Sequence, residues 1–210
     1  MGLEEIVEAI DRFLAIRDSA REEAVRISRD IVRLSKLVIT LIHRGDVEKA
    51  SSATIELESK VREIEEKVGK FPDLYYSGLI YNALSEYVEA ALLLDVVLKR
   101  SLRGFEELRV PPVPYLQGLG DLVGELRRLT LEKVRLGDFT EAWRLYRVME
   151  SIYVNLSKLE YPEPLIPGVR HKVDVARRIL DETLALLVDL ESRQLVAESM
   201  KALEVRQLEF

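Results

Sequence analysis

Acidic side chains within an otherwise apolar stretch are the residues best suited to chemistry. Residues 79–98 read LIYNALSEYVEAALLLDVVL, and charge enters only at Glu86, Glu89 and Asp95. At about 100° per residue, Glu86 and Glu89 share one helix face with Asn82, whereas Asp95 points the opposite way. A helix this apolar is expected in the middle of a bundle, where a buried carboxylate needs a partner. We therefore expect a cation at Glu86 and Glu89.

A second acid pair lies on a stretch with several glycines. Residues 115–136 read YLQGLGDLVGELRRLTLEKVRL, in which Asp121 and Glu125 are one helical turn apart. Glycine costs a helix up to about 1 kcal/mol relative to alanine, and it suits sites of close backbone approach. Three glycines therefore predict a near neighbour: Gly118, Gly120 and Gly124. Purely structural roles remain open, namely an ion pair from Glu125 to Arg128 and an interaction of Asp121 with the helix dipole.

A basic seam follows the first long helical segment. Steps of three, four and three residues place its members on one face: Arg26, Arg29, Arg33 and Lys36, with His43 and Arg44 beyond them. After Asp30 no acidic residue appears before Asp46. The seam is either an ordinary solvated face or a track for the phosphates of a nucleic acid.

Composition excludes several classes of function. The chain of 210 residues has no cysteine and two histidines, which argues against disulfides, thiolate chemistry and a zinc site. Its net charge of −6 argues against polyanion binding by the whole surface, but not by a local basic seam. The acidic, amphipathic N-terminus does not resemble a signal peptide, and Asp95 interrupts the one long apolar run. We expect a cytoplasmic protein without a membrane span.

Apolar periodicity predicts helices throughout and no strand. The fold class expected is therefore all-α, a single-domain bundle of about six or seven antiparallel helices over residues 1–210. The expected helices cover approximately residues 3–43, 47–68, 74–100, 115–136, 139–159 and 169–190. Residues 191–210 keep helical spacing and are expected either to extend the last helix or to dock on a partner subunit. At two positions a glycine is expected to end one helix and the following aspartate to cap the next: Gly45-Asp46 and Gly137-Asp138. The segment 110–114 is expected to be non-helical because of its prolines.

Three stretches together resemble the translin superfamily, and translin-associated factor X more than translin itself. They are RISRDIVRLSKLVITLIHR at residues 26–44, EYVEA at 86–90 and LRVPPVPYLQGLGDLVGELRR at 108–128. The third is the most specific, because a proline-rich lead into a glycine-bearing D-x-x-x-E helix is unusual. The resemblance extends over about residues 13–190 and implies a translin-like bundle of about seven helices.

The resemblance implies a function as well as a fold. Family members form hollow shells of about eight subunits that hold RNA or single-stranded DNA, and the nuclease-type subunit carries a magnesium site. Carried over by position, its metal-binding and catalytic acids are Glu86, Glu89, Asp121 and Glu125. Four carboxylates suit Mg²⁺, with Mn²⁺ also possible. The RNA-contacting surface corresponds to Arg26, Arg29, Arg33, Lys36 and Arg44.

The expected function is accordingly a divalent-metal-dependent endoribonuclease that cuts single-stranded RNA inside an oligomeric shell. A homo-oligomer is preferred, although a translin-like second subunit is also possible. Two other interpretations stay open: a non-catalytic oligomer that binds single-stranded RNA or DNA, and a helical scaffold for proteins whose acids pair with neighbouring arginines.

Overall fold

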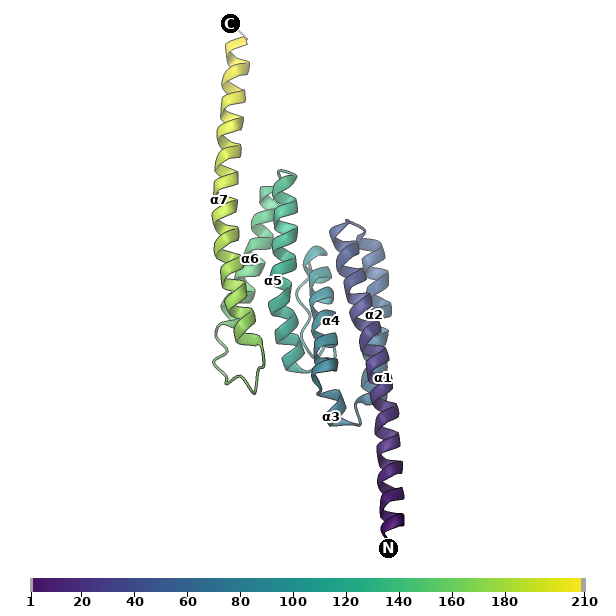
Figure 1. Ribbon diagram of the computed structural model, residues 1–210. Coiled ribbons are helices and arrows are strands. Elements are labelled where there is room, and N and C mark those ends of the chain that lie inside the picture. The colour runs from purple at the N-terminus through teal and green to yellow at the C-terminus, as the bar shows by residue number, and fades with distance from the viewer. Residues whose placement is uncertain (1, 209–210) are drawn as a thin grey trace. The chain divides into compact units, whose positions relative to one another are not determined.

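The computed structural model describes the backbone of residues 2–208 and the side chains through residue 200. Within this part the chain forms helices and no strand, which confirms the predicted all-α class (Figure 1). The helices are α1 (Leu3–His43), α2 (Val47–Val68), α3 (Pro72–Tyr75), α4 (Gly78–Val97), α5 (Pro112–Arg135), α6 (Phe139–Leu156) and α7 (Val169–Leu208). None of the helices in the described residues combines the length and the apolar character that crossing a bilayer requires.

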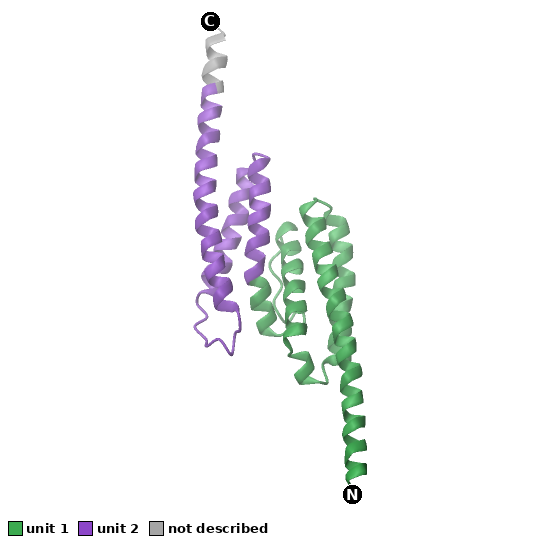
Figure 2. Cartoon of the chain, viewed as in Figure 1, with its two compact units in different colours: residues 1–119 green, residues 120–210 purple. Residues whose placement is uncertain are grey.

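The chain divides into two compact units, residues 1–119 and 120–210 (Figure 2). The first unit contains α1 to α4 and the start of α5, and the second contains the rest of α5 with α6 and α7. Because the two units are described separately, the expectation of a single domain stays a prediction.

Helix α4 forms the core of the first unit, as its apolar sequence predicts. It packs against both α1 and α2, and side chains such as Leu84, Val88 and Leu92 are fully buried. From α1, residues one or two turns apart, including Ile27, Ile31 and Val38, are equally buried. Burial on this scale is the main source of the unit's stability, because apolar area removed from water contributes about 25 cal/mol per Å².

Asp95 is a charged residue buried in this core, with 2% of its surface exposed. Its Oδ2 accepts hydrogen bonds from Arg103 Nε at 3.0 Å and from the Arg103 amide at 3.3 Å. Arg103 also reaches Glu58 on α2 at 2.7 Å. Burial lowers the pKa of Arg103, but its bonds to both carboxylates outweigh that effect and raise it. Asp95, which points away from the face that carries Glu86, therefore holds the segment between α4 and α5 against the core through its bonds to Arg103.

Two helix starts differ from those expected, and the helices expected to end near residues 100 and 159 end at Val97 and Leu156. The segment expected as one helix from residue 74 is broken at Tyr76 and Ser77, so α3 and α4 are separate; Ser77 has the extended backbone of an N-cap, and Gly78 follows it. The expectation of a non-helical segment through Pro114 was wrong, since α5 begins at Pro112. Proline is tolerated in a first helical turn because the amide that it lacks has no partner there.

The second unit is an antiparallel set of α5, α6 and α7. A Thr130 hydroxyl on α5 lies 3.9 Å from the sulfur of Met149 on α6, and Arg127 on α5 pairs with Glu182 on α7 at 2.9 Å. Trp143 Nε1 on α6 donates to Glu191 on α7 at 2.9 Å. Residues 191–208 continue α7, so the tail does extend the last helix.

Candidate nucleic-acid and metal site

The exposed part of α4 is a narrow strip that contains both of its predicted site acids. From residue 79 to residue 96, the α4 residues that are not buried are Leu79, Tyr81, Asn82, Glu86 and Glu89. Except for Tyr81 they lie within about 80° of arc on one face of the helix. We call Leu79, Asn82, Glu86 and Glu89 the α4 strip. The sequence predicted that these acids share a face with Asn82; they are half-buried rather than buried, because the strip reaches the surface.

Glu86 has the properties of a ligand without a competing partner. Its side chain is half-buried and makes no hydrogen bond or ion pair within the part of the chain that the structure describes. Glu89, also half-buried, follows three residues later on the same face. Carboxylate oxygens in such partly desolvated positions suit a hard divalent cation.

The other two predicted acids lie on α5 in the second unit, where cationic side chains already contact them. Asp121 is bound by Lys172, whose Nζ lies 2.5 and 2.6 Å from its two carboxylate oxygens. Glu125 lies 3.9 Å from Arg128, the ion pair that its sequence position suggested. Within neither unit do three or more acidic or histidine side chains of the described residues gather in a metal-binding arrangement. The four-carboxylate site therefore stays a prediction.

Close contacts with neighbouring residues explain two of the three α5 glycines. A Cβ at Gly118 would lie 2.5 Å from the Ser85 carbonyl oxygen and 2.7 Å from Val88 Cβ, so this glycine allows α5 to approach α4. A Cβ at Gly120 would lie 2.8 Å from Lys172 Cβ, so this one admits the lysine that binds Asp121. At Gly124 nothing lies within 4 Å, and no contact explains that glycine.

Some cations of the basic seam of α1 make ion pairs with acidic side chains, and others make none with the described residues. Arg26 donates to Glu23 and to Glu63 of α2, both at 2.8 Å, and these bonds raise its pKa. Arg33 is 3.2 Å from Asp30. Three further members of the seam are exposed and make no ion pair with the described residues: Arg29, Lys36 and Arg44.

The seam and the α4 strip meet at one hollow. Arg29, Arg33 and Lys36 of α1 line it together with Leu79 and Asn82 of α4, and its volume is about 460 Å³. Because Glu86 lies one turn beyond Asn82 on the same face, basic groups flank the approach to the acids. A polyanion that follows the seam would thus pass close to Glu86.

Some polar contacts of the described structure had no signal in the sequence. The bonds from Lys172 to Asp121 and from Arg26 to Glu63 join residues 51 and 37 positions apart. A single acid in an apolar helix, such as Asp95, predicts that some partner is buried with it. Nothing in the sequence identifies Arg103 as that partner.

Comparison with known proteins decides the family. The Translin family pattern matches residues 19–183, which is most of the chain. The chain belongs to the translin family. This confirms the resemblance drawn from the three sequence stretches.

Relatives of known sequence place the chain nearer to one branch of the translin family. An uncharacterised protein of Methanocaldococcus jannaschii is 30% identical over 200 residues, covering 92% of this chain and 86% of that protein. Translin-associated protein X of Rattus norvegicus is 27% identical over 187 residues, covering 69% of this chain and 63% of that protein. The chain thus spans less than two thirds of the length of translin-associated protein X, to which it is nevertheless closer than to translin.

Solved structures of the translin family show the same fold. AfC3PO, in a complex with duplex RNA, superimposes with a TM-score of 0.82 at 32% identity, covering 93% of this chain and 99% of that one. NeC3PO without ligand gives a TM-score of 0.80 at 25% identity, covering 90% of this chain and 99% of that one.

Proposed function

We propose that this chain is the subunit of an oligomeric, Mg²⁺-dependent endoribonuclease that cuts single-stranded RNA. The observation that carries the proposal is the meeting of the α1 seam with the α4 strip. There, Arg29 and Lys36 line a hollow together with Asn82 of the α4 strip. Glu86 and Glu89 follow Asn82 on the same face of α4. RNA is the first nucleic acid to test because one similar protein, AfC3PO, has been solved with duplex RNA.

The basic residues would hold the strand by its phosphates. Arg29, Lys36 and Arg44 are the available cations, and Arg33 contributes after exchanging Asp30 for phosphate. This grip is electrostatic, independent of sequence and weakened by salt. Single-stranded DNA would compete for the same phosphate contacts.

The acids would hold the metal. Glu86 and Glu89 supply oxygens from α4, and Asp121 and Glu125 are the further ligands that we propose from α5. A Mg²⁺ ion held there would supply charge neutralisation at the phosphate and a more acidic water molecule. Lys172 would compete with a metal for Asp121, since its ammonium group contacts both carboxylate oxygens.

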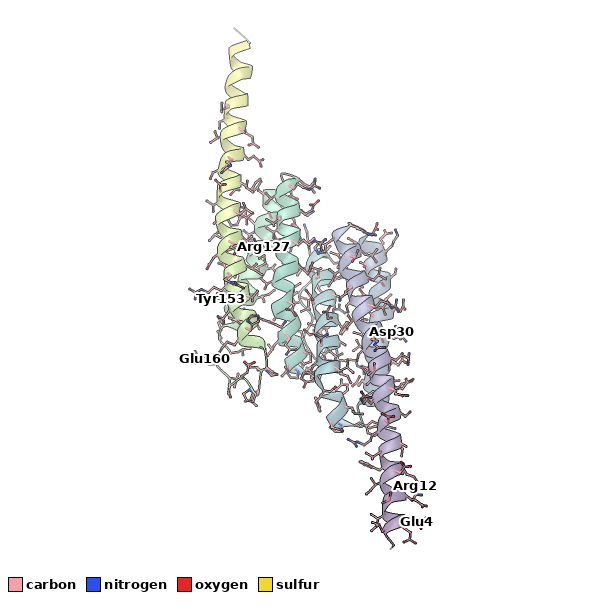
Figure 3. All side chains as sticks on the ribbon, in the orientation of Figure 1. Glu4, Arg12, Asp30, Arg127, Tyr153 and Glu160 are labelled. Carbon is pink, nitrogen blue, oxygen red and sulfur yellow. The ribbon has the colours of Figure 1, made fainter. Side chains whose placement is uncertain are left out.

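Self-assembly is the remaining part of the proposal, and the N-terminal part of α1 supports it. Residues 2–16 are exposed, and this part of the helix extends beyond the other helices of its unit, where Figure 3 labels Glu4 and Arg12. Six of its large apolar side chains fall within about 120° of arc at steps of three and four residues, and Ile16 lies outside this arc. They are Leu3, Ile6, Val7, Ile10, Phe13 and Leu14, each at least 41% exposed. A second copy of the chain would cover this face, and a translin-like second subunit is the alternative.

The test is cleavage of end-labelled single-stranded RNA by the purified protein, with Mg²⁺ and with EDTA. We expect products only with the metal, and a loss of at least about a hundredfold in rate for Glu86→Gln and Glu89→Gln. Glu56→Gln is the matched control, because Glu56 is an exposed α2 acid outside the site. Cleavage that persists in EDTA, or in both site variants, would contradict the proposal.

A non-catalytic RNA-binding oligomer is the second candidate, and one observation favours it. Lys172 and Arg128 already compensate Asp121 and Glu125, so these two acids need no metal in the described structure. Tight RNA binding without any metal-dependent cleavage would establish this candidate instead.

A further inference from the structure

The hollow between α1 and α4 has a lining that suits more than a phosphate. Seven residues of the first unit form it, and we call it the α1–α4 niche: Ser28, Arg29, Val32, Arg33, Lys36, Leu79 and Asn82. Its volume of about 460 Å³ lies within the usual range of small-molecule sites, about 300–1,000 Å³. A binding surface for phosphates alone needs cations but no recess of this size.

Apolar and hydrogen-bonding groups are combined in the niche. Val32 and Leu79 provide apolar walls, and Leu79 is 44% exposed although it lies at the start of a core helix. The Asn82 carboxamide is exposed and makes no hydrogen bond with any described residue. A flat ligand would bury its faces on the walls and bond its polar edge to the amide. The cations at the rim would then hold an attached phosphate.

Ser28 provides an independent observation in favour of a polar ligand. Its residue surface is 2% exposed, and its Oγ has no hydrogen-bond partner among the described residues. Seven residues later in the same helix, Ser35 Oγ donates to the Ile31 carbonyl at 2.8 Å, which is the usual arrangement. A buried hydroxyl without a partner costs free energy, which a ligand in the niche would recover after a rotation about the serine Cα–Cβ bond.

We propose that the α1–α4 niche binds one unpaired nucleobase of the RNA strand, adenine in preference to pyrimidines. The Asn82 carboxamide would accept from N6 and donate to N7, the pairing that asparagine makes with adenine. The base must be unpaired and unstacked to enter a recess of this kind. The inference rests on the proposed function, because it names what that site recognises.

The position of the niche gives this recognition a consequence for cleavage. Asn82 and Glu86 are four residues apart on one face of α4, so they are separated by about 6 Å along the helix axis. A base held at Asn82 therefore brings a neighbouring phosphodiester toward Glu86. The proposed nuclease would cut at a set position relative to an unpaired adenine.

The test separates recognition from catalysis by measuring binding in EDTA, where no metal-dependent cleavage occurs. Fluorescence anisotropy compares oligoadenylate, oligouridylate and oligocytidylate of equal length at low salt. We expect oligoadenylate to bind about fivefold more tightly than the pyrimidine strands, the low end for a bidentate contact. Asn82→Ala should remove this preference and leave oligouridylate binding within about twofold of the parent.

Two matched controls complete the experiment. Asn155→Ala removes an exposed amide of α6 outside the niche and should keep the preference. Ser28→Ala should weaken oligoadenylate binding without lowering the melting temperature, whereas Ser35→Ala, which removes a hydroxyl already bonded within the helix, should leave binding unchanged.

Each outcome has a defined meaning. Equal affinity for the three strands, or a preference that survives in Asn82→Ala, would overturn the inference. Adenine preference without cleavage in Mg²⁺ would refute only the nuclease and leave the niche in place. Absence of RNA binding at low salt would refute both.

Discussion

The Nζ of Lys172 on α7 lies 2.5 and 2.6 Å from the two carboxylate oxygens of Asp121 on α5. One ammonium group thus occupies both oxygens of an acid that is a proposed metal ligand. Gly120 permits this arrangement, since a Cβ there would lie only 2.8 Å from Lys172 Cβ. Lysine and metal should therefore compete for Asp121.

The first prediction follows from this competition. Replacing Lys172 by methionine removes the competing charge and keeps most of the side-chain volume, so Mn²⁺ should bind more tightly by about three- to tenfold. Calorimetric titration of the metal measures the change. Lys158→Met is the control, because Lys158 bonds to Asn155 away from Asp121. Unchanged or weaker metal binding by the Lys172 variant would show that Asp121 is a structural partner of the lysine.

The second prediction compares two glycines of α5. Gly118→Ala should lower the free energy of unfolding by about 2 kcal/mol, because its Cβ would meet the Ser85 carbonyl oxygen and Val88. Gly124→Ala should raise it by about 0.5–1 kcal/mol, since the new methyl group has open space and alanine favours the helix. Urea unfolding of the two variants beside the parent measures both effects. Destabilisation of equal size at both positions would contradict the contact described for Gly118.

The third prediction separates two arginines of the α1 seam. Arg29→Gln should weaken RNA binding and reduce the dependence of log K on log salt by about one, as expected for one lost phosphate contact. Arg26→Gln should change RNA binding less and lower the melting temperature more, because Arg26 joins α1 to Glu63 of α2. Anisotropy titrations at several salt concentrations and thermal unfolding provide the two measurements. The reverse pattern would assign the phosphate contact to Arg26.

The fourth prediction concerns acid stability. Hydrogen bonds from Arg26 and Lys67 lower the pKa of Glu23 from 4.5 to about 2, and those from Lys60 and Arg26 do the same for Glu63. Below pH 4.5 the unfolded chain therefore binds protons that the folded chain does not. The stabilisation is complete above about pH 5 and is lost as the pH falls toward 2.

Melting temperatures measured from pH 7 to pH 3 test this effect. The double variant Glu23→Gln, Glu63→Gln should be less stable than the parent at pH 7, and its melting temperature should fall less steeply with acid. Salt should reduce the difference, because these side chains are partly exposed. Parallel curves for parent and variant would contradict the pKa shifts.

Local signals in the sequence predicted most of the helix boundaries. Gly45 and Gly137 adopt φ of 81° and 76°, the left-handed conformation expected where each helix ends. Asp138 accepts from the Glu141 amide at 3.0 Å, whereas the Asp46 side chain makes no capping hydrogen bond. Such features depend on residues close in sequence, which is why composition and spacing reveal them.

Contacts between distant residues were beyond the same reasoning. Periodicity placed Glu86 and Asn82 on one face of α4. It could not show that Glu86 has no ion pair among the described residues while Lys172 binds Asp121. It likewise grouped Arg26 with Arg29, although only Arg26 meets an acid of α2. The packing of neighbouring helices decides which cation of the seam is left without an ion pair. The spacing of residues within one helix does not predict that packing.

The fifth prediction tests the exposed apolar face of α1. Ile6 and Ile10 lie at its centre and are 41% and 52% exposed. The double variant Ile6→Asp, Ile10→Asp should reduce the mass of the assembly measured by light scattering, since two charges cannot be buried between helices without partners. Arg12→Glu changes the net charge by the same amount on the opposite face, where Arg12 is 3.7 Å from Glu8, and should leave the mass unchanged. If the Ile variant keeps the parent's mass, another surface assembles the chain; if both variants dissociate, charge rather than the apolar face controls assembly.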